Sequence, residues 1–158
     1  MQVNNRTYQM PKQPVVVVCV DGCEPDYLGQ AVAGGHMPWM KKVLAQGTGL
    51  HADCVVPSFT NPNNLSIVTG VPPSVHGICG NYLYDSANNV EVMMNDPKWL
   101  RAPSLLATLA DAGCKMAVVT AKGLSLPSLM KGNTGVTVSN DMSTWPPNKS
   151  VVNGALPL

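Results

Sequence analysis

Two polar residues stand at positions where a protein could do chemistry. Asp21 ends the apolar run "VVVVCV" at residues 15–20, and Thr60 precedes an Asn-Pro pair that opens a helical pattern. A carboxylate can bind a metal ion, and a hydroxyl at a helix N-terminus lies near N–H groups that stabilise an alkoxide or an anionic oxygen. Asp21 and Thr60 are therefore candidate metal ligands, and Thr60 is also a candidate nucleophile.

The alternative for both residues is helix capping, because Asp and Thr are among the preferred N-cap side chains. A threonine hydroxyl is a weak nucleophile until it loses its proton, and coordination to Zn²⁺ is one way to activate it near neutral pH. The residue types alone leave capping and catalysis open.

Apolar runs and helical patterns alternate along the chain. Continuous or β-branched apolar runs predict strands at residues 14–20, 50–56, 90–94 and 115–121. Segments with Pro near the start and Gly at the end predict helices at residues 24–35, 37–47, 61–70 and 102–113. This order predicts an α/β fold with a mainly parallel sheet flanked by helices. Asp21 would then follow a buried strand, at the sheet edge where such folds bind ligands.

The composition changes after residue 122. Residues 123–158 hold three charged side chains, Lys131, Asp141 and Lys149, and show no sustained helix or strand period. We expect this tail to be irregular.

Charge and cysteine content narrow the partners and the compartment. The net charge is +1 and the longest run of basic residues is Lys41-Lys42, which argues against binding to nucleic acid or to an anionic membrane. Five cysteines without a CxxC pair suggest neither a disulfide framework nor a zinc finger. The first 14 residues lack the pattern of a secretion signal, and no apolar run is long enough to span a membrane. We expect a cytoplasmic protein; the oligomeric state stays open.

Four segments together resemble a known family. "VCVDGCEPDYL", "PSFTNPNNLSIVTGVPPSVHGICGNYLYD", "EVMMNDPKWLRAPS" and "DAGCKMAVVTAK" are similar to the N-terminal part of the phosphonoacetate hydrolases, two-zinc enzymes of the alkaline phosphatase superfamily. The resemblance implies an alkaline-phosphatase-like fold, incomplete here, with residues 1–122 as the N-terminal part of the hydrolase domain and residues 123–158 as a divergent tail.

The resemblance also implies roles for individual residues. Asp21 and Thr60 would bind the same zinc ion, and Thr60 would attack phosphorus. Asn81 would contact the phosphonyl group of the substrate, and Lys122 would bind its carboxylate. The implied reaction is cleavage of the P–C bond of phosphonoacetate, a small phosphonate substrate, to acetate and phosphate, with two zinc ions in a complete site.

The likeness ends after Lys122, where Leu124 replaces a second lysine that is usual in the family. The other zinc ligands of the family lie beyond this point, and His36, His51 and His76 show no ligand spacing. Two alternatives remain: a nucleotide pyrophosphatase or phosphodiesterase of the same superfamily, whose pocket would want apolar walls where Lys122 suits a small anion, and a truncated, catalytically inactive fragment.

Overall fold

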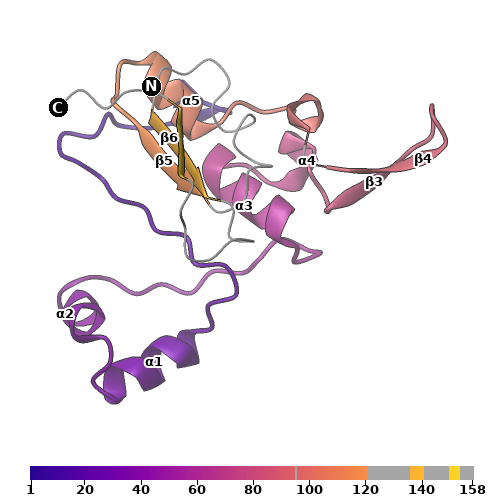
Figure 1. Cartoon of the computed structure of the whole chain (residues 1–158). Coiled ribbons are helices and arrows are strands. Elements are labelled where there is room, and N and C mark those ends of the chain that lie inside the picture. Colours follow the sequence, from indigo (N-terminus) through magenta and orange to yellow (C-terminus); the bar gives the residue numbers. More distant parts are fainter. Residues whose placement is uncertain (95, 121–135, 141–149, 154–158) are drawn as a thin grey trace. The chain divides into compact units, whose positions relative to one another are not determined.

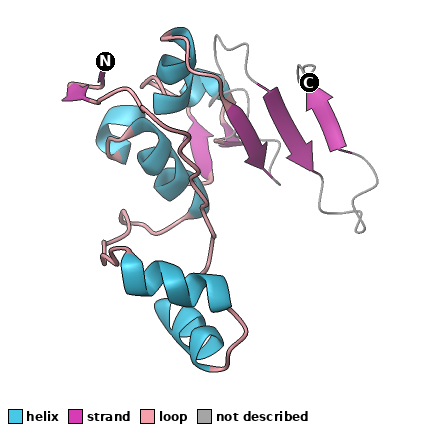
Figure 2. Cartoon of the chain, turned by 90° about the vertical axis from the view of Figure 1, so that its left-hand side faces the viewer, coloured by secondary structure: helices cyan, strands magenta, loops and turns pink. Residues whose placement is uncertain are grey.

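The computed structural model describes residues 1–94, 96–120, 136–140 and 150–153. The chain divides into two units. One contains residues 1–12 and 54–158, and the other contains residues 13–53. Each unit is described by itself below, and Figures 1 and 2 show their helices and strands.

The unit of residues 13–53 contains two helices in contact, α1 (Pro25–Ala33) and α2 (Pro38–Gln46). Both begin with a proline, whose fixed φ suits the first helical turn. After α1, Gly35 has a φ of +76°, the Gly35 amide donates to the Val32 carbonyl, and the His36 amide donates to the Ala31 carbonyl. This pair of hydrogen bonds is a Schellman motif, so the predicted glycine stop of the first helix is confirmed.

The two strands predicted around these helices are absent. Residues 14–20 and 50–56 form neither strand nor helix, and Val15 and Val16 are 71% and 84% exposed. A strand buried on both faces exists only where other strands pair with its edges and layers cover its faces. Among the described residues neither segment has such a partner, so the apolar pattern alone was misleading here.

The unit of residues 1–12 and 54–158 contains the remaining elements. The helices are α3 (Thr60–Thr69), α4 (Pro73–His76), the 3₁₀ turn η1 (Pro97–Trp99) and α5 (Leu105–Asp111). The strands are β1 (Gln2–Val3), β2 (Arg6–Thr7), β3 (Tyr82–Asp85), β4 (Val90–Met93), β5 (Ala117–Thr120), β6 (Val136–Asn140) and β7 (Ser150–Asn153).

These strands form three small sheets. The pairs β1–β2 and β3–β4 are antiparallel hairpins, and the third sheet has the order β5–β6–β7, with β5 parallel to β6 and β6 antiparallel to β7. Among the described strands β5–β6 is the one parallel pair, so the mainly parallel sheet stays a prediction. The predicted strands around residues 90–94 and 115–121 are confirmed as β4 and β5.

Two features of the strands differ from the prediction. Strands β6 and β7 lie inside residues 123–158, so the prediction of an irregular tail is wrong for these two segments. Strand β3 was not predicted. Residues 71–89, which contain it, were predicted as neither helix nor strand. Strand β3 is stabilised by its pairing with β4 and by the turn between them, where Asp85 accepts hydrogen bonds from the amides of Ala87 and Asn88. Strand pairing of this kind depends on a partner strand elsewhere in the chain or on hydrogen bonds of turn side chains. The alternation of apolar and polar residues along one strand reveals neither.

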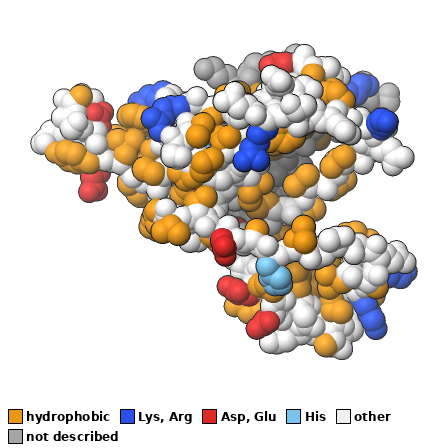
Figure 3. Space-filling view, turned by 180° about the vertical axis from the view of Figure 1, so that it is seen from behind, with side chains coloured by type: hydrophobic (Ala, Val, Ile, Leu, Met, Phe, Trp, Pro, Cys, Tyr) orange, Lys and Arg blue, Asp and Glu red, His pale blue; other side chains and the backbone are white. Residues whose placement is uncertain are grey.

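A small apolar core lies under α3 and α5. Leu65, Ile78 and Met94 are buried together, and the half-buried side chains that pack on them are Val68, Leu83, Trp99, Leu100 and Leu106. Asn4, with a φ of +49°, ties the N-terminal hairpin to this core, because its side-chain amide donates to the carbonyls of Thr69 (2.8 Å) and Pro103 (3.0 Å). Figure 3 shows one face of the molecule, on which hydrophobic side chains are frequent and charged ones are sparse.

Gly77 lets two segments of this unit approach closely. It follows α4 with a φ of +88°, and a Cβ at this position would lie 2.5 Å from Arg101 Nε and 3.1 Å from the Trp99 carbonyl oxygen. Gly113, after α5, has the same φ of +88° but nothing within 4 Å of such a Cβ. The two glycines therefore have the same φ, but only at Gly77 would an added Cβ meet neighbouring atoms.

We predict that Gly77→Ala destabilises this unit more than Gly113→Ala. An alanine in the left-handed region costs about 1–2 kcal/mol at either site, and at residue 77 the clash with a backbone carbonyl adds to this cost. Urea unfolding of both variants measures the difference. Equal losses of unfolding free energy would contradict the close approach.

Candidate functional site

Thr60 is the first residue of α3, with Phe59 as the N-cap. The prediction placed the cap at Thr60, one residue later than the structure does. The Phe59 side chain makes no capping hydrogen bond. The first-turn N–H groups of an α-helix have no acceptor within the helix, and they carry the positive end of its dipole. The half-buried Thr60 thus lies where negative charge on oxygen is stabilised.

Asn63 holds the chain that leads into this helix. Its Oδ1 accepts a hydrogen bond from the Val55 amide at 3.0 Å, and its Nδ2 donates to the Phe59 carbonyl at 2.9 Å. One side chain therefore fixes both the incoming segment and the N-cap residue. Asn63 was not predicted as a site residue; the signal for it in the sequence was an Asn in the first turn of a predicted helix.

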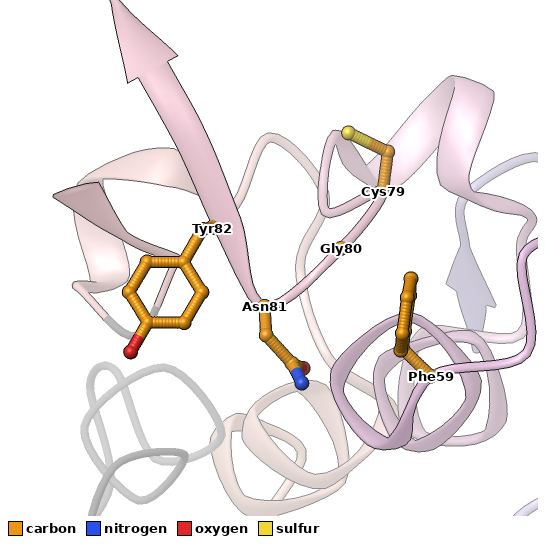
Figure 4. A pocket seen from close by; sticks show the side chains of 5 residues that line it. All are labelled: Phe59, Cys79, Gly80, Asn81 and Tyr82. Carbon is orange, nitrogen blue, oxygen red and sulfur yellow. The ribbon is translucent and has the colours of Figure 1, made fainter. Parts of the chain in front are cut away.

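Asn81 lines a shallow hollow beside the start of α3. The hollow has a volume of about 400 Å³ and is lined by Phe59, Cys79, Gly80, Asn81 and Tyr82. Figure 4 shows the Asn81 side chain between the rings of Phe59 and Tyr82. Phe59 adjoins Thr60 in the chain, so the structure brings the segment of the predicted nucleophile and the predicted phosphonyl contact to one hollow.

The Asn81 side chain carries an unused hydrogen-bonding group. Its Oδ1 is buried and has no partner in the part of the chain that the structure describes. The Asn81 backbone is held, because its carbonyl accepts from the Met94 amide at 2.7 Å. A buried polar atom without a partner is unfavourable by about 1–3 kcal/mol. An amide here can turn either its oxygen or its NH₂ toward a bound molecule, which makes Asn81 suited to contact a ligand.

His76 connects α4 to α3. It is fully buried, and its Nε2 lies 3.0 Å from the Ser66 hydroxyl oxygen, which in turn donates to the Pro62 carbonyl at 2.7 Å. On the other side of the ring, the Ile78 amide donates to Nδ1 at 3.1 Å. Burial is the main cause that lowers the pKa of His76; the Pro62 carbonyl opposes this shift, and the nearby Arg101 charge adds to it. Since the Ile78 N–H donates to Nδ1, this nitrogen carries no proton and the ring is neutral.

Of the other predicted site residues, Asp21 belongs to the unit of residues 13–53 and Lys122 lies outside the described residues. Asp21 is exposed and lies in a turn with Gly22 at a φ of +70° and not at the end of a strand. The exposed His36 and His51 form no part of the hollow.

The expected zinc site is not completed by these residues. Among the residues described, no group of three or more His, Cys, Asp and Glu side chains is placed to hold a metal ion. Asp21 and Thr60 would supply two oxygens, whereas a catalytic zinc takes three protein ligands.

No helix in the described ranges has both the length and the apolar character that crossing a bilayer requires.

Solved structures of an enzyme resemble this chain closely. Phosphonoacetate hydrolase from Sinorhizobium meliloti 1021, in complex with phosphonoformate or phosphonoacetate, is 55% identical in sequence and superposes with TM-scores of 0.78 and 0.77. The match covers 83% of this chain and 32% of the enzyme. It confirms the resemblance to the phosphonoacetate hydrolases.

More distant relatives share parts of the sequence. Human ectonucleotide pyrophosphatase/phosphodiesterase family member 1 is 32% identical over 108 residues, and the venom phosphodiesterase of Macrovipera lebetinus is 30% identical over 112 residues. The chain spans only 12% and 13% of these two proteins.

A family profile covers most of the chain. The profile described as type I phosphodiesterase / nucleotide pyrophosphatase matches residues 15–154, a range that contains Asp21, Thr60, Asn81 and Lys122. The chain belongs to the type I phosphodiesterase / nucleotide pyrophosphatase family.

Proposed function

We propose that this chain carries the nucleophile and part of the substrate site of a hydrolase that cleaves the P–C bond of phosphonoacetate. The observation that carries the proposal is the 55% identity, over 83% of this chain, to an enzyme crystallised with phosphonoacetate. The buried Asn81 oxygen, which has no hydrogen-bond partner among the described residues and lies in a hollow beside the start of α3, also supports it.

In the proposed reaction, Thr60 Oγ attacks phosphorus and the P–C bond breaks. The electron pair of that bond stays with the carboxymethyl group, which takes up a proton and leaves as acetate. Water then hydrolyses the phospho-threonine, so that phosphonoacetate and water give acetate and phosphate. The positive end of α3 stabilises charge on the phosphonyl oxygens, Asn81 binds one of these oxygens, and Lys122 holds the carboxylate.

Zinc remains part of the proposal through Asp21 and Thr60. The described residues do not complete a site for it, so we propose that zinc is held by these two only together with further ligands.

The family match favours a second candidate, hydrolysis of a nucleotide pyrophosphate or phosphodiester. The hollow with Phe59 and Tyr82 at its walls suits an apolar group, whereas Lys122 suits a small carboxylate. The third candidate is an inactive fragment. Assays of phosphonoacetate and of a nitrophenyl phosphodiester, on the chain and on a chimera in which it replaces the matching part of the S. meliloti enzyme, separate the three.

We predict that in this chimera Thr60→Ser keeps measurable turnover of phosphonoacetate, while Thr60→Ala lowers kcat by about a thousandfold or more. Serine retains the hydroxyl at the start of α3, and alanine removes it. Release of phosphate measures the rates. Thr7→Ala, at an exposed position in β2, is the control and keeps full activity. Unchanged turnover in Thr60→Ala would rule out the assigned nucleophile.

We predict that Lys122→Ala raises KM for phosphonoacetate about tenfold or more and leaves the hydrolysis of bis(p-nitrophenyl) phosphate nearly unchanged. In the proposal, the lysine binds a carboxylate that the diester lacks. Lys115→Ala removes an exposed lysine and serves as the matched control. If both substrates lose equally, Lys122 acts on the phosphorus group or on the fold, and the assignment fails.

We predict that the 158-residue chain, dialysed against micromolar Zn²⁺, retains less than one zinc per chain and does not hydrolyse phosphonoacetate. Two oxygens, one of them a hydroxyl that must lose its proton, make a weak site. Elemental analysis measures the metal. Two tightly held zinc ions, or turnover that a chelator abolishes, would overturn this prediction and direct attention to His36, His51 and His76.

A further inference from the structure

We infer that His76 is a positioning residue of the proposed site, which sets the first turn of α3, where Thr60 lies, against the segment that carries Asn81. This inference rests on the proposed function for its catalytic consequence. Its structural part concerns one chain of hydrogen bonds, from the Ile78 amide through His76 and Ser66 to the Pro62 carbonyl.

The donors and acceptors of this chain fix the proton on the imidazole. Ser66 has one hydroxyl proton, and it goes to the Pro62 carbonyl. The Ser66 oxygen must therefore accept from His76, which places a proton on Nε2. Nδ1 accepts from the Ile78 amide, so it carries none. A second proton on the ring would oppose the Ile78 N–H, in line with the lowered pKa of His76.

The chain joins the two places that the proposed reaction needs. Pro62 lies two residues after Thr60 in the first turn of α3, and Ile78 lies three residues before Asn81. The His76 backbone is held as well, since its amide donates to the Pro72 carbonyl and its carbonyl accepts from Arg101. Because both ring nitrogens are used and the residue is 0% exposed, a shift of His76 would move or break both ends.

Four substitutions separate the positioning role of His76 from its contribution to packing. In His76→Gln the amide nitrogen can take the place of Nε2 and keep the donation to Ser66. In His76→Asn the side chain reaches only the place of Nδ1, so the link to α3 is lost. Ser66→Ala breaks the same link from the other side. Thr69→Val is the matched control, since it removes a buried hydroxyl that donates to the Leu65 carbonyl at the far end of the same helix.

The first test is nitrogen NMR of the imidazole in the 158-residue chain. We expect the Nε2–H tautomer at pH 7. A proton on Nδ1 would overturn the inference, because it would leave the Ile78 amide without its acceptor.

The second test is amide hydrogen exchange along α3 in the same chain. His76→Asn and Ser66→Ala should speed exchange at Asn63 and Asn64 about tenfold, as expected for the loss of one buried hydrogen bond, while Ser66→Ala leaves Gly70 nearly unchanged. His76→Gln should restore slow exchange at the first turn, and Thr69→Val should act at Gly70 instead. Equal effects of His76→Gln and His76→Asn, or uniform acceleration along α3 in Ser66→Ala, would overturn the inference.

The third test is kinetic, in the chimera with the S. meliloti enzyme. His76→Asn should lower kcat for phosphonoacetate about tenfold or more, and His76→Gln should recover most of it. If exchange behaves as expected while Thr60→Ala remains active, the proposed nucleophile fails and the positioning role stands. If Thr60→Ala is inactive while His76→Asn keeps full kcat, the catalytic part of the inference fails alone.

Discussion

An imidazole that is fully removed from water needs a hydrogen-bond partner at each ring nitrogen, and this requirement organises the region around α3. His76 meets it with Ile78 on one side and Ser66 on the other, and in doing so it links helix α3 to the segment that follows α4. The apolar contacts of Leu65, Ile78 and Met94 surround this link but have no direction of their own. The polar contacts therefore decide how α3 faces the hollow.

Three polar side chains of helix α3 form hydrogen bonds with carbonyls one turn earlier in the chain. Asn63, Ser66 and Thr69 each donate a side-chain hydrogen bond to the carbonyl four residues earlier, at Phe59, Pro62 and Leu65. Such side-chain bonds usually compete weakly with the backbone hydrogen bonds of a helix. In α3 each of them brings a second donor to a carbonyl of the helix or its N-cap. The side chain of the N-cap residue Phe59 makes no capping hydrogen bond. Its ring forms a wall of the hollow.

Local signals predicted the helices well and the strands poorly. Pro25 and Gly35 mark a helix start and stop through their own φ angles, so a single residue suffices. Strand formation depends on a partner strand. Among the described residues the valines after Pro14 have none, whereas the modest "VTVSN" of β6 has one in β5. In the site, the position of Thr60 followed from the helix pattern and that of Asn81 only from resemblance. The roles of Asn63 and His76 depend on carbonyls and amides, which a side-chain pattern does not show.

The side chain at position 4 faces two demands at once. Its backbone has a positive φ, which glycine, asparagine and aspartate accept most readily. Its amide nitrogen also serves two carbonyls, at Thr69 and Pro103, and this needs a primary amide on a short stem. Glycine and aspartate meet the first demand, but asparagine alone among the twenty residues also supplies a primary amide on a short stem. Substitution at this position is therefore limited by two requirements at once, one set by the backbone and one by the side chain.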